Sequence, residues 1–513
     1  MVKLSTKSVS IAIASFVVAV VDEHHSTSSL SLVFLVDSRE MRSTSGDGEP
    51  VAHVLAIPHT IQGHLNPMLR FTTQLARSGI TVSFVCMEDS IPRLTSTETE
   101  SPHFHFVPVQ IPQTGWVGSV NVFKEAFEPL MEKLINDKNT GIAGPTCIIS
   151  DMFFTWTCDL AEKLKIPRYM LMTSGVLLAR FWQGSLEYLN DGRLQVSEAD
   201  GNLVEFEGSV CISGLPPLRF RDLDFFRTDI PFHRRVAESL TRSAGVLVNT
   251  FLELEKGVVE AFRNPNGDGE NHTKVAKIYP VGPLFATTNL TTTGNVFGLE
   301  DSSSQCIRWL DSQPSSSVLY VAFGSMARLR PEQIEELAYG LEASNQRFLW
   351  VCPLKKIQGE KELPTSITEV LPPGFEERVG DRGCVVTGWA PQLEILAHSS
   401  TAGFFTHGGW NSSLESVIFG IPIISWPQGA EQPVNCRYMV EVLKIAEQLQ
   451  TGKENNVTRK EVERAVRLLM VDSEGKAIKK RVEELKKIAA AATAEGGSRS
   501  RIFHEFLDDI RSH

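Results

Sequence analysis

The stretch WAPQLEILAHSSTAGFFTHGGWNSSLESVIFGIPIISWPQGAEQ, residues 389–432, decides the fold of this chain. An apolar run at 402–406 has the composition of a buried strand, and it ends at a His-Gly-Gly turn. Apolar side chains then recur at helical spacing between 414 and 418, and a second apolar run follows at 421–426. The pattern predicts a strand, a glycine turn, a helix and a second strand, which is the repeating unit of an open α/β sheet.

The two ends of the expected helix carry residues that begin and end helices. Ser412 and Glu415 have the spacing of a capping box, while Gly420 and Pro422 are typical of a helix end. Glycines in the turn let a ligand approach the backbone, and the free N–H groups of the helix N-terminus favour an anion such as phosphate. Many α/β proteins use a glycine turn only to reverse the chain, so the functional inference depends on the polar groups around it.

Polar and aromatic side chains are concentrated near the expected carboxyl ends of these strands, where open α/β sheets bind ligands. They are Trp389, His407, Trp410, Asn411, Ser412, Glu415, Glu431 and Gln432. Over residues 389–432 the sequence closely resembles the plant secondary product glycosyltransferase box, the signature of the family 1 UDP-sugar-dependent glycosyltransferases. Two positions depart from that pattern, with Gly408 where the family usually has Cys and Glu431 where Asp is common. Neither departure removes a needed functional group, although the choice of sugar becomes more open.

The resemblance implies three groups of contacts with a UDP-sugar. The uridine would be held by Trp389 stacking on the uracil, by Ala390 and Gln392 at its edge or the ribose, and by Glu415 accepting from the ribose hydroxyls. The diphosphate would be held by His407, Asn411 and Ser412, with a further hydroxyl from Ser325. The sugar would be contacted by Trp410, Glu431 and Gln432. Neutral donors and a helix terminus can neutralise a diphosphate, so we expect no metal and no cofactor besides the UDP-sugar co-substrate. Glu415 could instead serve only as a helix cap, and the two roles can coexist.

A first candidate for the catalytic base lies near the start of the regular pattern. Residues 54–58 have the pattern of a strand, 59–66 that of a loop and 67–77 that of a helix with proline in its first turn. The sequence IPHTIQGHLNP resembles the first loop of the same family, and the resemblance implies that His64 is the base. His59 lies five residues earlier, so the assignment depends on the Gln-Gly-His-Leu-Asn-Pro context. On the residues alone, a histidine in a loop is more often solvated or structural.

A partner for this histidine is expected at the end of another strand. Residues 147–151 are a short apolar run that ends in Asp151. The aspartate matches the family residue that bonds the base, fixes its tautomer and stabilises the imidazolium; the alternative is that it caps the following turn. The apolar and aromatic stretches 170–182 and 214–226 could line an acceptor pocket or simply pack in the core.

Composition limits the classes of partner. The 513 residues carry a net charge of −11 without a long Lys/Arg run, which argues against nucleic acid and anionic membranes. The eight cysteines show no metal-binding spacing, so we expect reduced thiols and a cytoplasmic protein. We also expect a monomer.

The domain layout follows from these segments. Residues 1–50 contain an apolar run too short to span a bilayer, and we expect an added, poorly ordered extension without stable membrane insertion. The alternative is that this extension is a targeting signal. We expect an acceptor-binding Rossmann-like domain at 51–285, a Thr/Ser/Gly-rich linker at 286–304 and a UDP-sugar-binding Rossmann-like domain at 305–490. Family resemblance places a last helix, 491–513, back across the first domain.

The sequence therefore predicts a GT-B protein, in which two Rossmann-like domains face a central cleft. The implied reaction is inverting transfer of a sugar, with glucose favoured by Gln432, from a UDP-sugar to a hydroxyl of a small lipophilic acceptor such as a flavonoid, another phenolic, a terpenoid or a hormone. A non-catalytic nucleotide-sugar binder is a second hypothesis, against which His64 and Asp151 argue. An NAD-dependent oxidoreductase is a third, and the lack of G-x-G-x-x-G after an expected strand argues against it.

Overall fold

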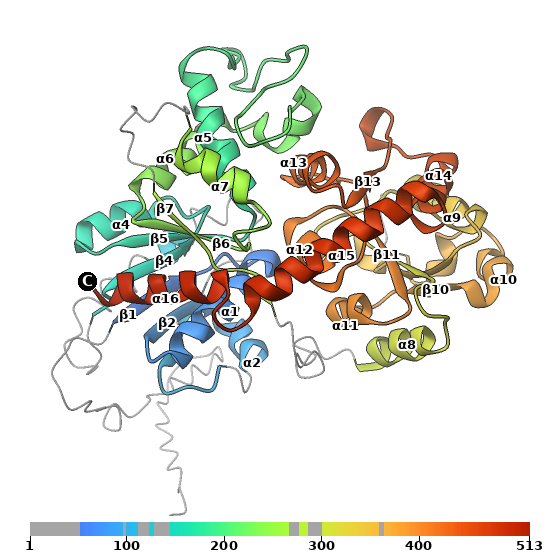
Figure 1. The fold of residues 1–513 in the computed structure, drawn as a ribbon, viewed down its shortest axis with the longest axis horizontal. Coiled ribbons are helices and arrows are strands. Elements are labelled where there is room, and N and C mark those ends of the chain that lie inside the picture. Colours follow the sequence, from blue (N-terminus) through green and yellow to red (C-terminus); the bar gives the residue numbers. More distant parts are fainter. Residues whose placement is uncertain are drawn as a thin grey trace, which may run out of the picture.

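The computed structural model describes residues 52–95, 99–110, 123–127, 144–265, 276–285, 300–358 and 364–512. The chain forms two separate parallel β-sheets, each covered by helices, and they lie side by side in Figure 1. This arrangement confirms the predicted GT-B fold class. The expected extension at 1–50 lies outside the described residues.

The first sheet contains seven parallel strands in the order β3-β2-β1-β4-β5-β6-β7. Its strands are β1 (His53–Ile57), β2 (Thr81–Met87), β3 (Phe104–Val109), β4 (Cys147–Asp151), β5 (Arg168–Met172), β6 (Gly245–Val248) and β7 (Lys277–Pro280). Its helices are α1 (Gln62–Arg77), α2 (Ile91–Leu94), α4 (Thr157–Leu164), α5 (Val176–Asn190), α6 (Ile230–Arg242) and α7 (Lys256–Arg263). The central strands β1, β4, β5 and β6 are buried at every position, because helices cover both faces of a parallel sheet.

The second sheet contains six parallel strands in the order β10-β9-β8-β11-β12-β13. Its strands are β8 (Val318–Ala322), β9 (Arg347–Val351), β10 (Gly383–Val386), β11 (Thr401–Thr406), β12 (Ile423–Ser425) and β13 (Ala446–Gln448). The helices around it are α8 (Glu300–Asp311), α9 (Pro331–Ala343), α10 (Phe375–Val379), α11 (Gln392–Ala397), α12 (Trp410–Phe419), α13 (Gln432–Arg437), α14 (Arg459–Met470) and α15 (Ser473–Thr493). The predicted unit β11-α12-β12 is present, and β8 and β12 flank β11 at the centre of the sheet.

Helix α1 begins earlier than the sequence suggested. We expected a loop up to residue 66 and a helix from Pro67, but the helix starts at Gln62, so Pro67 lies inside it. Proline has no N–H to donate to the carbonyl four residues earlier, which here belongs to Gly63. That carbonyl accepts a hydrogen bond from the Asn411 side chain at 3.0 Å instead. A contact from the other domain therefore satisfies the acceptor that the proline leaves without a helical partner.

The predicted capping box at the start of α12 is wrong. The N-cap is Gly409 and no side chain caps the helix, because α12 already begins at Trp410. Ser412 lies inside the first turn, and its Oγ accepts from Gln392 Nε2 at 3.1 Å. The other end agrees with the prediction, since Gly420 terminates the helix with a φ of 75°.

The last two helices connect the two halves of the molecule. Helix α15 runs along the second domain, and α16 (Ser498–Arg511) lies across the first (Figure 1). Phe506 of α16 is fully buried, and its ring lies 5.6 Å from that of Phe71 and 5.0 Å from that of Tyr169. Arg499 adds hydrogen bonds to the Val281 carbonyl at 3.0 Å and to Gln74 at 2.8 Å.

The segment between the sheets overlaps the expected linker. Residues 300–304 of that linker are helical, because α8 begins at Glu300, and 286–299 lie outside the described residues. Serine-rich sequence is typical of linkers, but serine is also favoured near the N-terminus of a helix. The composition therefore did not reveal that α8 begins at Glu300.

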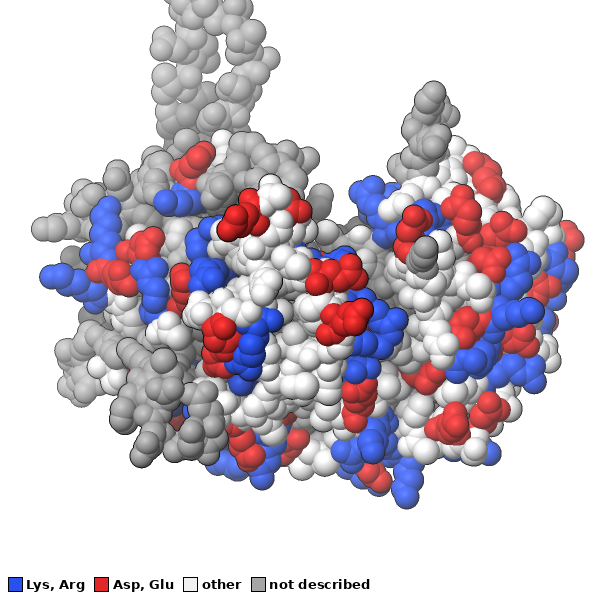
Figure 2. Space-filling view, turned by 90° about the horizontal axis from the view of Figure 1, so that it is seen from above, with Lys and Arg blue, Asp and Glu red and all other residues white. Residues whose placement is uncertain are grey.

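The charges on the surface and the composition of the helices can be compared with the partners expected from the sequence. Figure 2 shows acidic and basic side chains interspersed over one face, so the described part of that face offers no continuous basic stripe to a nucleic-acid backbone. Within the described ranges, no helix has the length and apolar composition needed to cross a membrane.

Candidate active site

The expected contact between His64 and Asp151 is present. Strands β1 and β4 are parallel neighbours, so the segments after them meet at the same edge of the sheet. His64 lies in the first turn of α1, which follows β1, and Asp151 is the last residue of β4. The His64 Nδ1 atom lies 2.7 Å from Asp151 Oδ2, and Asp151 Oδ1 accepts from the Phe153 N–H at 3.0 Å. The aspartate side chain is fully buried, whereas that of His64 is 14 % exposed.

The electrostatics of the pair favour a proton on the imidazole. Burial alone would lower the pKa of His64, but the charge and hydrogen bond of Asp151 outweigh it, and Glu431 adds a smaller effect in the same direction, so the pKa is raised. Burial alone would raise the pKa of Asp151, yet contact with His64 lowers it. If Nδ1 donates to the carboxylate, the neutral imidazole carries its lone pair on Nε2. That nitrogen can accept a proton from a substrate.

His59, the other histidine of this segment, has a different environment. Its side chain is buried, its ring stacks on Phe154 at 5.6 Å, and its Nδ1 accepts from the Ile61 N–H at 3.2 Å. Burial lowers its pKa to about 4. His59 therefore helps to fix the chain before α1 and stays neutral near neutral pH.

The turns after β8 and β11 meet around His407. A Cβ atom on Gly324 would lie 2.5 Å from His407 Cε1, so only glycine leaves room for the ring, and its φ of +69° also favours glycine. Burial lowers the pKa of His407 to about 4, with a further contribution from the Lys356 charge. Ser325 follows Gly324 and is exposed in the same turn.

Two groups expected to hold uridine, Gln392 and Glu415, lie beside α12 in contact with each other and with Ser412, which is expected at the diphosphate. Gln392 Nε2 donates to Glu415 Oε2 at 2.6 Å as well as to Ser412, and burial raises the pKa of Glu415 to about 7. Ala390 is buried, whereas Trp389 is 36 % exposed. The structure thus brings Gln392, Ser412 and Glu415 into direct contact.

Two residues at the start of α12 contact the first domain directly. Trp410 Nε1 donates to the Asn249 carbonyl at 2.7 Å. The Asn411 amide accepts from Asn249 Nδ2 at 2.8 Å and donates to the Gly63 carbonyl at 3.0 Å. The amide expected at the diphosphate is therefore occupied by contacts between domains in this structure.

The expected sugar contacts near the start of α13 have protein partners. Gln432 Oε1 accepts from the Gln428 N–H at 2.7 Å, and Glu431 Oε1 accepts from Asn435 Nδ2 at 3.3 Å. Glu431 also lies close enough to raise the pKa of His64, so the expected sugar and base sites face each other across the two domains.

Sequence reasoning missed Asn249 and Lys356. Asn249 directly follows the apolar strand β6, so the strand-end argument that selected Asp151 could also have found it. Lys356 ends a short 3₁₀ segment, Leu354–Lys356, outside any motif, and its position depended on how β9 and the following loop fold.

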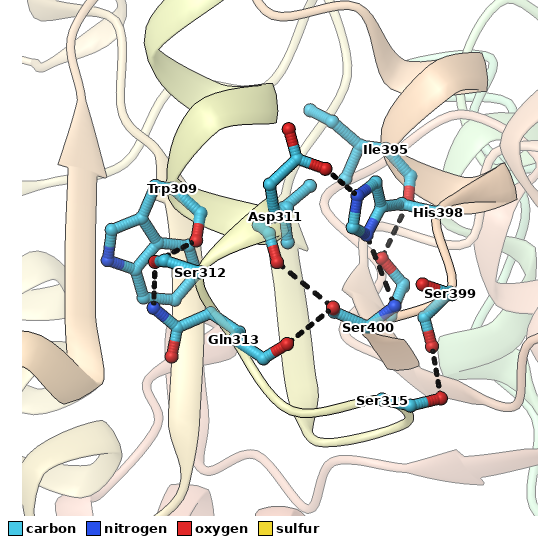
Figure 3. Close-up of polar contacts among 11 residues, drawn as sticks. Trp309, Asp311, Ser312, Gln313, Ser315, Ile395, His398, Ser399 and Ser400 are labelled. Atoms are coloured by element: carbon cyan, nitrogen blue, oxygen red, sulfur yellow. Dashed lines mark hydrogen bonds and ion pairs between the residues drawn. The ribbon is translucent and has the colours of Figure 1, made fainter.

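A second polar cluster contains serine, histidine and aspartate but lies at the start of β11, the end of the strand opposite His407 (Figure 3). His398 Nε2 lies 3.1 Å from Asp311 Oδ1. Ser400 Oγ, however, donates to the carbonyls of Leu310 at 3.0 Å and Gln313 at 3.1 Å, and not to the imidazole. This serine is not activated by the histidine, and the cluster serves to join α8 to the start of β11.

The described residues include no group of three or more His, Cys, Asp or Glu side chains that could hold a metal ion. The site geometry consists of a His–Asp pair on one Rossmann-like domain and a glycine turn with a helix N-terminus on the other. Together with the two-sheet fold, it defines a GT-B glycosyltransferase.

The chain belongs to the UDP-glycosyltransferase family. Residues 276–491 match the family described as UDP-glucoronosyl and UDP-glucosyl transferase. UDP-glycosyltransferase 72B1 of Arabidopsis thaliana is 33 % identical, with 88 % of this chain and 94 % of the relative covered. UDP-glycosyltransferase 71K2 of Pyrus communis is 32 % identical, with 88 % and 97 % covered. The solved structure of Phytolacca americana UGT2 complexed with UDP-2fluoro-glucose and pterostilbene is 29 % identical and has a TM-score of 0.75, with 90 % of this chain and all of that chain covered.

Proposed function

We propose that this protein transfers glucose from UDP-glucose to a hydroxyl of a small phenolic acceptor, with inversion at the anomeric carbon. The observation that carries the proposal is the His64–Asp151 pair, whose imidazole faces the Glu431 region of the donor domain. His64 is the general base and Asp151 orients it. The acceptor thus lies on the first domain and the UDP-sugar on the second.

The proposed reaction is a single displacement. His64 Nε2 takes the proton of the acceptor hydroxyl while the acceptor oxygen forms a bond to the anomeric carbon. The bond from that carbon to the β-phosphate oxygen breaks, and UDP leaves with the electron pair. The free N–H groups at the start of α12 are suited to the charge that develops on the diphosphate. UDP is a good leaving group, so no second carboxylic acid is required.

Aromatic side chains near the base support a phenolic acceptor. The Phe153 ring lies 5.2 Å from the His64 ring, and Phe232 and Trp182 lie 5.7 Å and 6.4 Å from Phe153. Such rings favour a flat aromatic ligand. The pterostilbene bound to the Phytolacca americana structure is a ligand of this kind.

Incubation with UDP-glucose and a panel of phenols tests the proposal, with UDP release measured and glycosides identified by mass spectrometry. We expect β-glucosides of at least one phenol. UDP binding without transfer to any acceptor would instead support a non-catalytic nucleotide-sugar binder.

The choice of glucose rests on Gln432, at a position where galactose-using members of the resembled family tend to carry histidine. Competition among UDP-glucose, UDP-galactose and UDP-xylose measures this choice. A clear preference for either of the other two sugars would refute the assignment.

A further inference from the structure

Lys356 is fixed at the turn that follows β8. Its backbone N–H donates to the Pro353 carbonyl at 2.9 Å, and its own carbonyl accepts from the Leu329 N–H at 3.2 Å. Its Nζ donates to the carbonyl of Gly324. The ammonium group is therefore positioned by the fold and does not extend freely into solvent.

The lysine charge lies beside the expected diphosphate site. Gly324, which binds the ammonium, also lies against the His407 ring, and the Lys356 charge contributes to the lowered pKa of that histidine. His407 precedes the two glycines that lead into α12. The cation and the helix N-terminus thus border the same turn.

Among the residues that the structure describes, little compensates the charge of Lys356. Burial lowers its pKa to about 8, and the Lys355 charge adds to this effect. Cys352 acts in the opposite direction, and burial raises the pKa of that thiol itself to about 12. Among the described residues, Lys356 forms no ion pair with a carboxylate. A partly buried cation whose partner among the described residues is a carbonyl and not a carboxylate costs free energy, which an anion at this position would recover.

We propose that Lys356 binds the diphosphate of the UDP-sugar and stabilises the negative charge that UDP gains as it leaves. This inference rests on the proposed function and adds a charged group to it, since the residues expected from the signature stretch to hold the diphosphate are neutral. Charge-assisted hydrogen bonds to phosphate are stronger than neutral ones, and a fixed cation aimed at a leaving group stabilises the transition state. Lys356 then does part of the work that a divalent cation does in metal-dependent transferases.

The test compares UDP with uridine, which lacks the phosphates, by isothermal titration calorimetry on the full chain. We expect Lys356→Met to weaken UDP binding by about 10- to 100-fold, the range for a hydrogen bond to a charged group, and to leave uridine binding unchanged. Lys356→Arg should retain most of the UDP affinity. Lys355→Met is the matched control, because Lys355 is exposed in the same 3₁₀ segment, and it should bind both ligands like the wild type.

Steady-state kinetics give a second readout. Because the charge on UDP grows in the transition state, Lys356→Met should lower kcat as well as raise KM for the UDP-sugar. Wild-type UDP affinity should fall as pH rises above about 8, where the ammonium deprotonates, and this fall should be absent in Lys356→Met. His407, with its pKa near 4, is neutral throughout that range and cannot produce the effect.

The outcomes separate the two proposals. Equal losses of UDP and uridine affinity in Lys356→Met would mean that the lysine only supports the Gly324 turn, and unchanged UDP affinity would mean that it does not reach the phosphates; either result overturns the inference alone. A wild-type protein that binds no UDP overturns the proposed function together with this inference.

Discussion

At the scale of single residues, the hydrogen bond between His64 and Asp151 makes the imidazole both oriented and basic. The carboxylate is fully buried, so its charge is screened by little water, while the imidazole edge reaches the surface of the site. The proposed chemistry depends on this asymmetry, because the group that exchanges a proton with substrate is the one that is accessible.

Replacing His64 by alanine should reduce transfer by about 10²- to 10⁴-fold, the usual loss on removing a general base. UDP affinity should stay nearly unchanged, because the second domain is expected to hold the nucleotide. Asp151→Ala should cost less, and the double variant should be little worse than His64→Ala, since the two residues act as a unit. Turnover on a weakly acidic alcohol is the appropriate measurement, because an acidic phenol can ionise without a base. Additive losses would contradict the proposed mechanism.

The pH dependence provides an independent check on the pair. The pKa of His64 is raised above its ordinary value of 6.5, so kcat/KM should fall on the acid side as the pH drops through this raised pKa and the base becomes protonated. Asp151→Asn removes the carboxylate charge and leaves burial, which lowers the pKa, as the main influence. The acid limb should therefore move to lower pH while the maximal rate also falls. An acid limb at the same pH in both proteins would show that another group titrates.

At the scale of elements, the N-terminus of α5 is held by a buried carboxylate. Glu255 Oε2 accepts from the Val176 N–H at 3.0 Å and Oε1 accepts from the Leu177 N–H at 2.8 Å. Glu255 is fully buried, and burial raises its pKa to about 7 in spite of these bonds. A group whose pKa is raised on folding keeps its proton in the native state over a range where the unfolded chain has already lost it.

This carboxylate should make the protein less stable as the pH rises. Between about 4.5 and 7 the folded state binds more protons at Glu255 than the unfolded state, so the free energy of unfolding falls with rising pH. Relative to wild type, Glu255→Gln should therefore gain up to about 3 kcal/mol between pH 5 and pH 8, measured by denaturant titration at both values. Glu260→Gln on the exposed side of α7 is the control and should give parallel curves. A wild-type pH slope that Glu255→Gln retains would rule out this carboxylate as its source.

The sequence was most informative where the length of a residue pattern and the residues at its ends favoured one structure. Continuous apolar runs predicted β4 and β11, because runs this short between turn residues are typical of buried parallel strands, and the ends of those strands located Asp151 and His407. The start of α1 could not be predicted, because a proline at its sixth position is tolerated only when another group, here Asn411, bonds the Gly63 carbonyl. The contact of Lys356 with Gly324 could not be predicted either, because it depends on which loops meet around that glycine.

At the scale of the whole molecule, the first domain is completed by the end of the chain. Phe506 lies among Phe71, Tyr169 and Tyr279, all of which belong to the first domain. Phe506→Ala should lower the free energy of unfolding by about 3–5 kcal/mol, although it lies close to the C-terminus. His504→Ala on the exposed side of α16 should change it by less than about 0.5 kcal/mol. Similar stabilities for the two variants would show that α16 is not part of the first domain's core.

The position of α16 also determines where related genes can be recombined. A chimera that takes everything after the first sheet from another family member places a foreign α16 against native partners such as Lys277, whose Nζ binds Asp509 at 2.6 Å, and Ser78, whose carbonyl accepts from Arg511 at 3.1 Å. The second domain is therefore best exchanged with two crossovers, one ahead of α8 and one between α15 and α16 near Gly496. The parental α16 then packs against the first domain of the same parent, and contacts such as that of Phe506 with Phe71 are kept.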